Sequence, residues 1–420
     1  MSSTGIVIVG AGLAGAVAAE TLREEGFGGR ITLLGAESHR PYERPPLSKG
    51  YLQGDADQES LFVHPEAWYA DHEVELGLGA AVTSLDLDAH TVTTDHQSRL
   101  RYDRLLLATG SSPRRLAIPG ADLDGIRYLR RIEDSNRIRE DFRAARRVVI
   151  VGGGWIGLET AAVARSAGLH VTVLEAAELP LVRVLGPEAA TLFADLHRGH
   201  GVDLRCQVQV SRFVGQGGTV SGVQLGDGQV LAADLVLVGV GISPNVQLAL
   251  DAGLEVDNGI SVDEHLRTSH PDVYAAGDVA NTWHPELGER LRVEHWANAR
   301  RQGAIAARAM LGQPATDFQP PYFFSDQYDL GMEYTGYVGR RGYDHVVLRR
   351  YPEPGQVIVF WLLEGRLLAG MNVNVWDVAD QIEQLIRSGR RLDTDDLASP
   401  DRPLAELGVA ASTSLVSSIS

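Results

Sequence analysis

The sequence predicts an α/β fold in which two similar strand–turn–helix–strand units are followed by a strand-rich C-terminal part. Residues 7–26 read VIVGAGLAGAVAAETLREEG and residues 149–168 read VIVGGGWIGLETAAVARSAG, so one pattern occurs twice. In the last hundred residues the pattern changes to short apolar and aromatic runs, around residues 346–348, 357–363 and 367–371. These runs predict strands and are followed by a segment with helical periodicity.

Each copy of the repeat begins with a β-branched run, turns at glycines, continues with a helix-like apolar pattern and enters a second short strand. In a GxGxxG turn the first glycine permits the bend, the second lets backbone approach a pyrophosphate, and the third lets helix pack on strand. An ordinary glycine-rich turn is the alternative for one isolated motif. Two copies in the same frame favour two Rossmann-like dinucleotide-binding domains, with glycines at Gly10, Gly12 and Gly15, and at Gly152, Gly154 and Gly157.

The acidic residue after the second strand indicates which nucleotide each copy binds. Glu175 directly follows Leu174, where a carboxylate accepts hydrogen bonds from the adenosine ribose hydroxyls. A 2′-phosphate about 4 Å away would cost roughly 4 kcal/mol at an effective dielectric of about 20, so this copy should prefer NADH. In the first copy Gly35 stands at the equivalent position and the nearest acid is Glu37, which favours FAD.

Composition narrows the class of protein. The 420 residues include 55 acidic and 38 basic side chains, a net charge of −17 that disfavours nucleic acid and anionic membrane surfaces as partners. We expect no membrane span, because no run of about 18 apolar residues occurs. The apolar N-terminal stretch lacks the basic residues of a secretory signal, so a cytoplasmic location is expected.

The single cysteine, Cys206, excludes an internal disulfide, a CxxC redox pair and a multi-cysteine metal site. It lies in the strand-like stretch 203–210, where we expect a small buried hydrophobic residue. No metal site is expected elsewhere: His197 and His200 stand three apart, but no third ligand accompanies them. Without an internal thiol relay, a reduced flavin would have to pass its electrons to another molecule.

The basic residues comprise 37 arginines and one lysine, Lys49, which ends the segment PYERPPLSK at residues 41–49. Two interpretations stay open: a solvated loop lysine, or a compact charge beside the flavin N5. Arg44 adds a cation to this segment. Asp278, in YAAGDVA, is interpreted as a partner of a ribityl or ribose hydroxyl or as a helix N-cap before Val279, and the two are compatible.

These motifs resemble a known family. The two dinucleotide motifs, PPLSK, LLLATGSSPRRLAIPG at 105–120, GVGISPN at 239–245, YAAGDVA at 274–280 and FFSDQYD at 323–329 are similar to those of FAD-dependent NADH:ferredoxin reductases, which serve haem-thiolate monooxygenases and Rieske dioxygenases. The resemblance implies a glutathione-reductase-like fold with the NADH domain inserted in the FAD domain, and a C-terminal α+β domain with an antiparallel sheet. The implied divisions are FAD-binding 1–112, NADH-binding 113–244, FAD-binding 245–318, C-terminal interface 319–405 and a flexible tail 406–420.

The resemblance also assigns site residues. Lys49 and Glu159 are the implied catalytic pair and are expected to touch each other near the flavin. The residues implied at FAD are Gly10, Gly12, Leu13, Ala14, Gly15, Glu37, Arg44, Lys49, Ala81, Val82, Ala108, Thr109, Gly110, Arg130, Gly277, Asp278, Glu294, His295 and Trp296. The residues implied at NADH are Gly152, Gly154, Trp155, Ile156, Gly157, Glu159, Glu175, Arg183, Val240, Gly241 and Ile242.

The implied activity is hydride transfer from NADH to FAD, followed by transfer of single electrons to a 2Fe-2S ferredoxin. The alternatives are a rubredoxin reductase, an NADH oxidase, or a non-catalytic NADH-sensing flavoprotein resembling apoptosis-inducing factor, and either a monomer or a homodimer is compatible. The seven arginines of residues 130–147 form either a ferredoxin-docking face or a solvated helix. Relatives often carry tryptophan in the segment Tyr322-Phe323-Phe324, so the electron-exit route is open.

Overall fold

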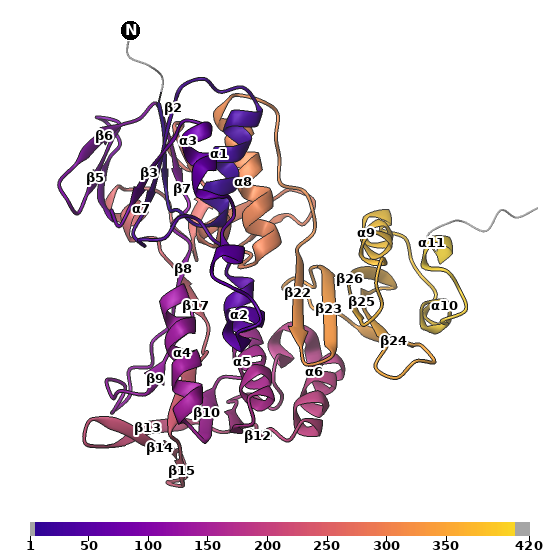
Figure 1. The fold of residues 1–420 in the computed structure, drawn as a ribbon. Helices are drawn as coiled ribbons and strands as arrows, with labels where there is room; N and C mark the ends of the chain where they lie inside the picture. The colour runs from indigo at the N-terminus through magenta and orange to yellow at the C-terminus, as the bar shows by residue number, and fades with distance from the viewer. Residues whose placement is uncertain (1–4, 408–420) are drawn as a thin grey trace, which may run out of the picture. The chain divides into compact units, whose positions relative to one another are not determined.

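The computed structural model describes residues 5–407, which form two compact units divided after residue 319 (Figure 1). The first unit contains two parallel five-stranded sheets, and the second contains one antiparallel sheet. This architecture confirms the predicted α/β fold with two dinucleotide-type sheets and a C-terminal antiparallel sheet.

The first parallel sheet is built from two separate stretches of chain. Its order is β19-β7-β1-β2-β3, with β1 Gly5–Val9, β2 Arg30–Gly35, β3 Val74–Leu78, β7 Arg104–Leu107 and β19 Val273–Ala275. Helices α1 (Leu13–Glu24) and α8 (Trp296–Met310) run side by side (Figure 1). They approach closely because Gly303 has no side chain: a Cβ there would lie 2.5 Å from the Ala14 carbonyl oxygen.

The second parallel sheet lies wholly within the chain between β7 and β19. Its order is β12-β11-β10-β16-β9, with β9 Ile126–Arg127, β10 Arg147–Val151, β11 His170–Leu174, β12 Asp203–Arg205 and β16 Leu235–Val238. Its helices are α4 (Ile132–Ala144), α5 (Trp155–Ser166) and α6 (Val182–Gly199). An antiparallel sheet follows, of β13 Val210–Gln216, β14 Thr219–Leu225 and β15 Val230–Ala232. One dinucleotide-type fold is therefore nested inside the other.

Smaller elements complete the first unit. The two sheets are joined by β8 (Ser111–Pro113) and β17 (Ile242–Pro244), which pair with each other. Two three-stranded sheets contain β4 Val82–Asp86, β5 Thr91–Thr94, β6 Arg99–Arg101, β18 Ile260–Val262, β20 Ala280–His284 and β21 Glu289–Leu291. The short helices are α2 Gly50–Gln53, α3 Glu66–Asp71, α7 Gln247–Asp251, and 3₁₀ turns η1 Pro45–Ser48, η2 Glu59–Leu61 and η3 Gly277–Val279.

The second unit packs helices on an antiparallel sheet. The order is β22-β23-β26-β25-β24, with β22 Tyr322–Gln327, β23 Leu330–Gly336, β24 His345–Arg350, β25 Val357–Leu363 and β26 Arg366–Val373. Its helices are α9 Ala379–Ser388, α10 Thr394–Ala398 and α11 Leu404–Leu407. Ile382 and Leu385 of α9 join Phe360 in the apolar core, as the helical periodicity predicted.

Several local expectations need correction. Asp278 does not cap a helix, because it lies inside η3, whose N-cap is Ala276. Cys206 lies between β12 and β13 and is only partly buried, so it is not the buried strand residue that we expected. Of the expected tail, residues 406–407 end α11 and residues 408–420 lie outside the described residues.

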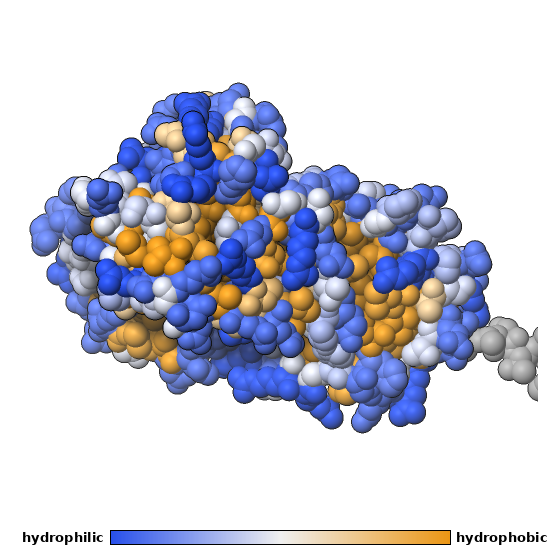
Figure 2. Space-filling model, turned by 90° about the horizontal axis from the view of Figure 1, so that it is seen from below, coloured by the Kyte–Doolittle hydropathy of each residue, from blue (hydrophilic) through white to orange (hydrophobic). Residues whose placement is uncertain are grey.

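The surface shows separate apolar patches among hydrophilic side chains on the face drawn in Figure 2. Among the described residues, the large apolar side chains that are exposed are Ile156, Val184, Val230, Leu250, Trp283, Leu287, Phe318 and Trp376. Within residues 5–407, no helix is both long enough and apolar enough to cross a membrane.

Candidate dinucleotide and electron-transfer site

The first glycine of each motif permits a turn that no other residue would fit. Gly10 has a φ of +124°, and a Cβ there would lie 2.0 Å from the carbonyl oxygen of Ala108. Gly152 repeats this arrangement, with a φ of +108° and a Cβ position 2.3 Å from the Gly239 carbonyl oxygen. Both values lie where L side chains are strained, so each strand can turn into its helix only at glycine.

The second and third glycines of each motif have different roles. A Cβ at Gly15 or Gly157 would lie about 2 Å from the carbonyl oxygen of the motif's first glycine, at 2.2 and 2.1 Å respectively. A Cβ at Gly12 would meet nothing within 4 Å, and one at Gly154 would meet a single carbonyl oxygen at 4.0 Å. The third glycine thus serves packing, while the second borders open space before a helix N-terminus. This cradle fits a pyrophosphate at each turn.

Glu175 is held beside the second glycine turn, directly after β11. Its Oε2 accepts a hydrogen bond from the Gly153 amide at 2.7 Å, and its Oε1 accepts one from the Ala177 amide at 2.7 Å. Two backbone donors orient the ionised carboxylate, and each oxygen has a further lone pair for a ribose hydroxyl. The position predicted for ribose recognition is therefore pre-formed.

A partly buried charged network occupies the corresponding side of the first sheet. Glu37 accepts hydrogen bonds from Tyr42 Oη at 2.5 Å and from Arg44 Nη2 at 2.8 Å. Arg44 also donates to the backbone carbonyl of Arg130, whose Nη2 donates to Asp278 Oδ2 at 3.0 Å. Four residues expected at FAD, far apart in the chain, therefore meet in one network.

Electrostatics keep this network charged. Burial would raise the pKa of Glu37, but Arg44 and the Tyr42 hydroxyl outweigh it and lower that pKa. Burial lowers the pKa of the Arg130 guanidinium, and the nearby Arg44 lowers it further. Because an arginine stays protonated even after such a shift, two guanidiniums and two carboxylates face one another in a partly exposed setting. Such a set fits the diphosphate and hydroxyl groups of a dinucleotide.

Lys49 meets Glu159 between the two parallel sheets. Lys49 Nζ lies 2.9 Å from Glu159 Oε1, and Ser48 Oγ donates to Glu159 Oε2 at 2.5 Å. Glu159 is on α5 and is 4% exposed, while the lysine side chain is 19% exposed. The contact implied by the resemblance is present, and the solvated-loop interpretation of Lys49 is wrong. Sequence reasoning missed Ser48, whose only signal was its place beside the lysine.

The turn that carries Asp278 is fixed from α8. The Gly277 amide donates to Gln302 Oε1 at 2.9 Å, and Gln302 Nε2 donates to Thr282 Oγ1 at 2.9 Å. Gln302 is 2% exposed, and its Nε2 also donates to Asp317 Oδ2 at 3.0 Å, so its amide satisfies three neighbours in the core. The sequence held no signal for this residue, because its partners lie in other elements.

Other residues expected at FAD flank this network. Thr109 and Gly110 follow β7, and Arg130 Nη2 would lie 3.4 Å from a Cβ at Gly110. Glu294 pairs with Arg292, and burial raises the pKa of its carboxyl. The remaining residues lie at the start of α1, at the start of β4, at the end of β7 and at the N-terminus of α8, namely Leu13, Ala14, Ala81, Val82, Ala108, His295 and Trp296.

The residues expected at NADH lie on or beside α5, at the start of α6 and after β16. Trp155 starts α5 and packs edge-to-face on Phe193, with the two ring centroids 5.4 Å apart. Ile156 and Arg183 are exposed in the first turns of α5 and α6. The final three follow β16, namely Val240, Gly241 and Ile242. The roles of all these side chains stay predictions.

The arginine-rich segment of residues 130–147 forms ion pairs with nearby carboxylates. In α4, Arg137 pairs with Asp141 at 3.6 Å, and after the helix Arg147 pairs with Asp234 at 2.6 Å. Pairing of this kind reduces the net charge of the arginine-rich segment, whose role as a docking face stays a prediction.

In the second unit, Tyr322 of the segment Tyr322-Phe323-Phe324 is held by a hydrogen bond: its Oη donates to a carboxylate oxygen of Glu333 at 2.6 Å.

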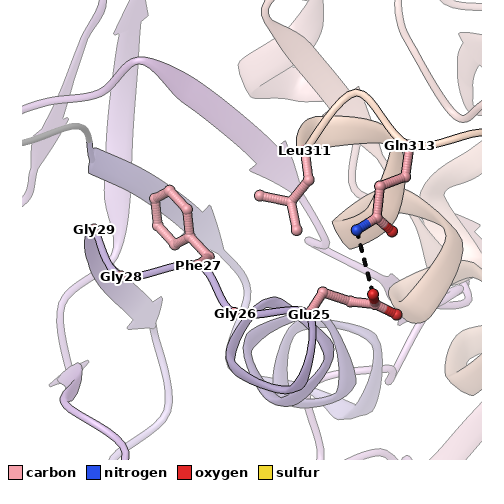
Figure 3. Close-up of a pocket in the computed structure, with 7 residues that line it drawn as sticks. All are labelled: Glu25, Gly26, Phe27, Gly28, Gly29, Leu311 and Gln313. Carbon is pink, nitrogen blue, oxygen red and sulfur yellow. Dashed lines mark hydrogen bonds between the residues drawn. The ribbon is translucent and has the colours of Figure 1, made fainter.

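A separate depression lies at the far end of α1 from its glycine turn (Figure 3). It has a volume of about 580 Å³ and is lined by Glu25, Gly26, Phe27, Gly28, Gly29, Leu311 and Gln313. Gln313 Nε2 donates to Glu25 Oε2 at 3.2 Å across it. None of the residues expected at FAD or NADH lines this depression, so it is not part of the candidate site.

Comparison with known proteins decides the family. Residues 4–303 match the family model of pyridine nucleotide-disulphide oxidoreductases, and residues 322–408 match that of the reductase C-terminal domain. The chain belongs to the pyridine nucleotide-disulphide oxidoreductases. The family expected from the motifs is confirmed.

Relatives match the oxidoreductase over almost its whole length. Putidaredoxin reductase from Pseudomonas putida is 39% identical over 418 residues, which cover 98% of each chain. The ferredoxin–NAD(+) reductase component of the biphenyl dioxygenase system of Paraburkholderia xenovorans is 42% identical, over 88% of this chain and 90% of the relative. The crystal structure of the covalent putidaredoxin reductase–putidaredoxin complex superposes with a TM-score of 0.92 at 38% identity, covering 96% of this chain and 98% of that chain.

Proposed function

We propose that this oxidoreductase takes hydride from NADH onto bound FAD and passes single electrons to a 2Fe-2S ferredoxin, which serves a haem-thiolate monooxygenase or a Rieske dioxygenase. The observation that carries the proposal is the Lys49–Glu159 pair, 2.9 Å apart, which joins the two dinucleotide-type folds at one point. Names of relatives that reduce ferredoxins for both kinds of oxygenase support the choice of acceptor. The chain would work in the cytoplasm.

FAD and NADH supply the hydride chemistry and the division of the electron pair. The chain's own residues bind and orient these groups. The first glycine turn, with Arg44 and Arg130, would hold the FAD diphosphate, and Glu37 and Asp278 would accept hydroxyl hydrogen bonds. The second turn would hold the NADH diphosphate, with Glu175 on the adenosine ribose.

Lys49 and Glu159 would act where the two cofactors meet. Lys49 presents a donor at the flavin side, and Glu159 orients that ammonium from the nicotinamide side. Ser48 donates to the other oxygen of the Glu159 carboxylate, so the carboxylate cannot rotate away without losing a hydrogen bond. Glu159 is 4% exposed, so water approaches the contact only from the side of the lysine, whose side chain is 19% exposed.

The same proposal assigns the remaining roles. The FAD-binding parts would be residues 1–112 and 245–318, the NADH-binding part residues 113–244, and the C-terminal interface residues 319–405. The other motif residues named in the sequence analysis would line the two nucleotides. These assignments agree with β8 and β17, where the chain crosses between the two sheets.

The lone cysteine supports an external electron acceptor. Thiol reductases of this fold use a cysteine pair at the flavin, whereas this chain has only Cys206, which lies beside β12 of the nested sheet. Burial raises the pKa of the Cys206 thiol, Arg198 opposes this and Glu175 adds to it, so the pKa lies above its ordinary value and the thiol stays protonated.

Steady-state reduction of cytochrome c by NADH, with and without 2Fe-2S ferredoxins, tests the proposal. We expect the rate to depend on ferredoxin concentration. An equal rate without ferredoxin would favour an NADH oxidase or a diaphorase. A higher rate with rubredoxin would make the chain a rubredoxin reductase, and no turnover with any acceptor would favour an NADH-sensing flavoprotein.

A further inference from the structure

Two short strands connect the parallel sheets, and they pair with each other. β8 follows the first sheet's β7, and β17 follows the second sheet's β16. At one end the backbone amide of Asn245 donates to the Gly110 carbonyl oxygen at 2.9 Å. At the other end the backbone amide of Arg114 donates to the Gly241 carbonyl oxygen at 2.9 Å. The two crossings therefore form one ribbon rather than two independent linkers.

Two prolines stiffen the ribbon without weakening it. Pro113 lies opposite Ile242, and Pro244 lies opposite Ser111. Hydrogen-bonded pairs alternate with unbonded pairs in antiparallel strands, so both proline nitrogens occupy positions that face away from the partner strand. Each proline restricts φ and no ladder hydrogen bond is lost. Rotation of one sheet relative to the other is thus concentrated at the ends of the ribbon.

The side chain of Asn245 closes the end next to the first sheet. Its Nδ2 donates to the Thr109 carbonyl oxygen at 2.8 Å, and its Oδ1 accepts from Ser112 Oγ at 2.8 Å. The Asn245 carbonyl oxygen accepts from Thr109 Oγ1 at 2.8 Å. One residue therefore binds the strand end and the ribbon together. The side chain must donate and accept at once, which an amide does and a carboxylate does not.

The ribbon joins two groups of residues expected at different cofactors. Thr109 and Gly110 are expected at FAD, and Gly241 and Ile242 at NADH. At the second end, Arg114 Nε donates to the Ile242 carbonyl oxygen at 3.0 Å. A change of angle at either end would displace one group relative to the other.

We propose that Asn245 is a positioning residue that sets the orientation of the NADH-binding sheet relative to the FAD-binding sheet, and thereby the approach of hydride donor to acceptor. The inference rests on the proposed function. It also predicts that Asn245 maintains the Lys49–Glu159 contact, because those side chains belong to the two parts that the ribbon joins.

The test substitution is Asn245→Asp, which keeps the size of the side chain and replaces the donor with an acceptor facing the Thr109 carbonyl. In anaerobic stopped-flow experiments, reduction of bound FAD by NADH should slow about tenfold to a hundredfold, as expected for a small misplacement of reacting groups. The apparent Kd for NADH should stay within about twofold. Ferredoxin reduction by chemically reduced enzyme should be unchanged. Ser243→Ala, an exposed position in the middle of β17, is the matched control and should behave as wild type.

A second measurement needs neither cofactor turnover nor ferredoxin. Spin labels at the exposed positions Ala67→Cys on α3 and Asp195→Cys on α6, in a Cys206→Ser background, report the distance between the two parts by pulsed electron resonance. Asn245→Asp should broaden the distance distribution, whereas Ser243→Ala should not.

An unchanged distance distribution together with an unchanged rate of flavin reduction in folded Asn245→Asp protein would overturn the inference. So would a slower rate explained entirely by loss of FAD or weaker NADH binding. If this variant does not fold, Ser112→Ala removes one of the hydrogen bonds to Asn245 and should give a smaller effect in the same direction. If wild-type FAD is not reduced by NADH, the proposed function fails, and the distance measurement alone still decides the role of Asn245.

Discussion

Replacing Glu159 with glutamine should slow flavin reduction sharply and leave the fold intact. The substitution preserves the shape of the side chain and its acceptance of the Ser48 hydrogen bond, but it removes the charge facing Lys49. Two unit charges at the observed 2.9 Å attract by about 6 kcal/mol at an effective dielectric of about 20. Water that reaches the partly exposed ammonium recovers most of this energy in the variant. We therefore expect a net loss of about 1 to 3 kcal/mol in the arrangement that reacts.

This loss corresponds to flavin reduction slower by about tenfold to a hundredfold. The measurement is anaerobic stopped-flow bleaching of oxidised flavin on mixing with NADH, at several NADH concentrations, so that binding and reduction are separated. Glu188→Gln, an exposed carboxylate on α6, is the matched control and should reduce at the wild-type rate. FAD content and thermal unfolding are checked in both variants. A wild-type reduction rate in folded, FAD-loaded Glu159→Gln would refute the reasoning.

Three further predictions follow from single contacts. Glu175→Gln should reduce the preference for NADH over NADPH in kcat/KM by about tenfold or more, since like-charge repulsion of the 2′-phosphate is removed; an unchanged ratio contradicts the assignment. Arg147 lowers the pKa of Asp234 to about 2, so Asp234→Asn should cost about 1 kcal/mol near pH 7, and that difference should shrink as pH falls from about 4 towards 2. Arg349 is 1% exposed and donates hydrogen bonds to three backbone carbonyls. Arg349→Met should therefore lower the free energy of unfolding of the C-terminal unit, measured by urea denaturation, by about 3 kcal/mol. Arg350 is exposed, so Arg350→Met should change this free energy little.

The sign of the pH prediction follows from the direction of the shift. The folded-state pKa of Asp234 lies below its ordinary value of 3.8, so its ion pair stabilises the fold above that value and is lost as the carboxylate is protonated. The largest cause of this lowered pKa is the hydrogen bond from Arg147. The partial exposure of both side chains limits the contribution of the ion pair to the free energy of unfolding. A difference between Asp234→Asn and wild type that persists unchanged at pH 3 would contradict this account.

Several contacts in the candidate site join residues that lie far apart in the chain. The Ser48–Glu159 hydrogen bond joins residues 111 positions apart, and the Arg130–Asp278 hydrogen bond joins residues 148 positions apart. Motif resemblance placed most of these residues at a cofactor, but the one contact that it implied was Lys49–Glu159. Ser48 carried no signal beyond its place beside the lysine and Gln302 carried none, because such serines and glutamines are common. Cys206 was misjudged because a β-like pattern continued across a break between two strands.

The sequence alone determined the two glycine turns and the absence of a cysteine pair, and it carries the prediction that Glu175 favours NADH. These follow from local geometry: a left-handed glycine, the strand and helix periods, and the distance along one strand–helix–strand unit are all set within about thirty residues. Only the tertiary structure decided that Lys49 is paired rather than solvated, and that Asn245 holds the ribbon between the two sheets. Contacts of that kind depend on how distant elements pack, and local patterns do not encode them.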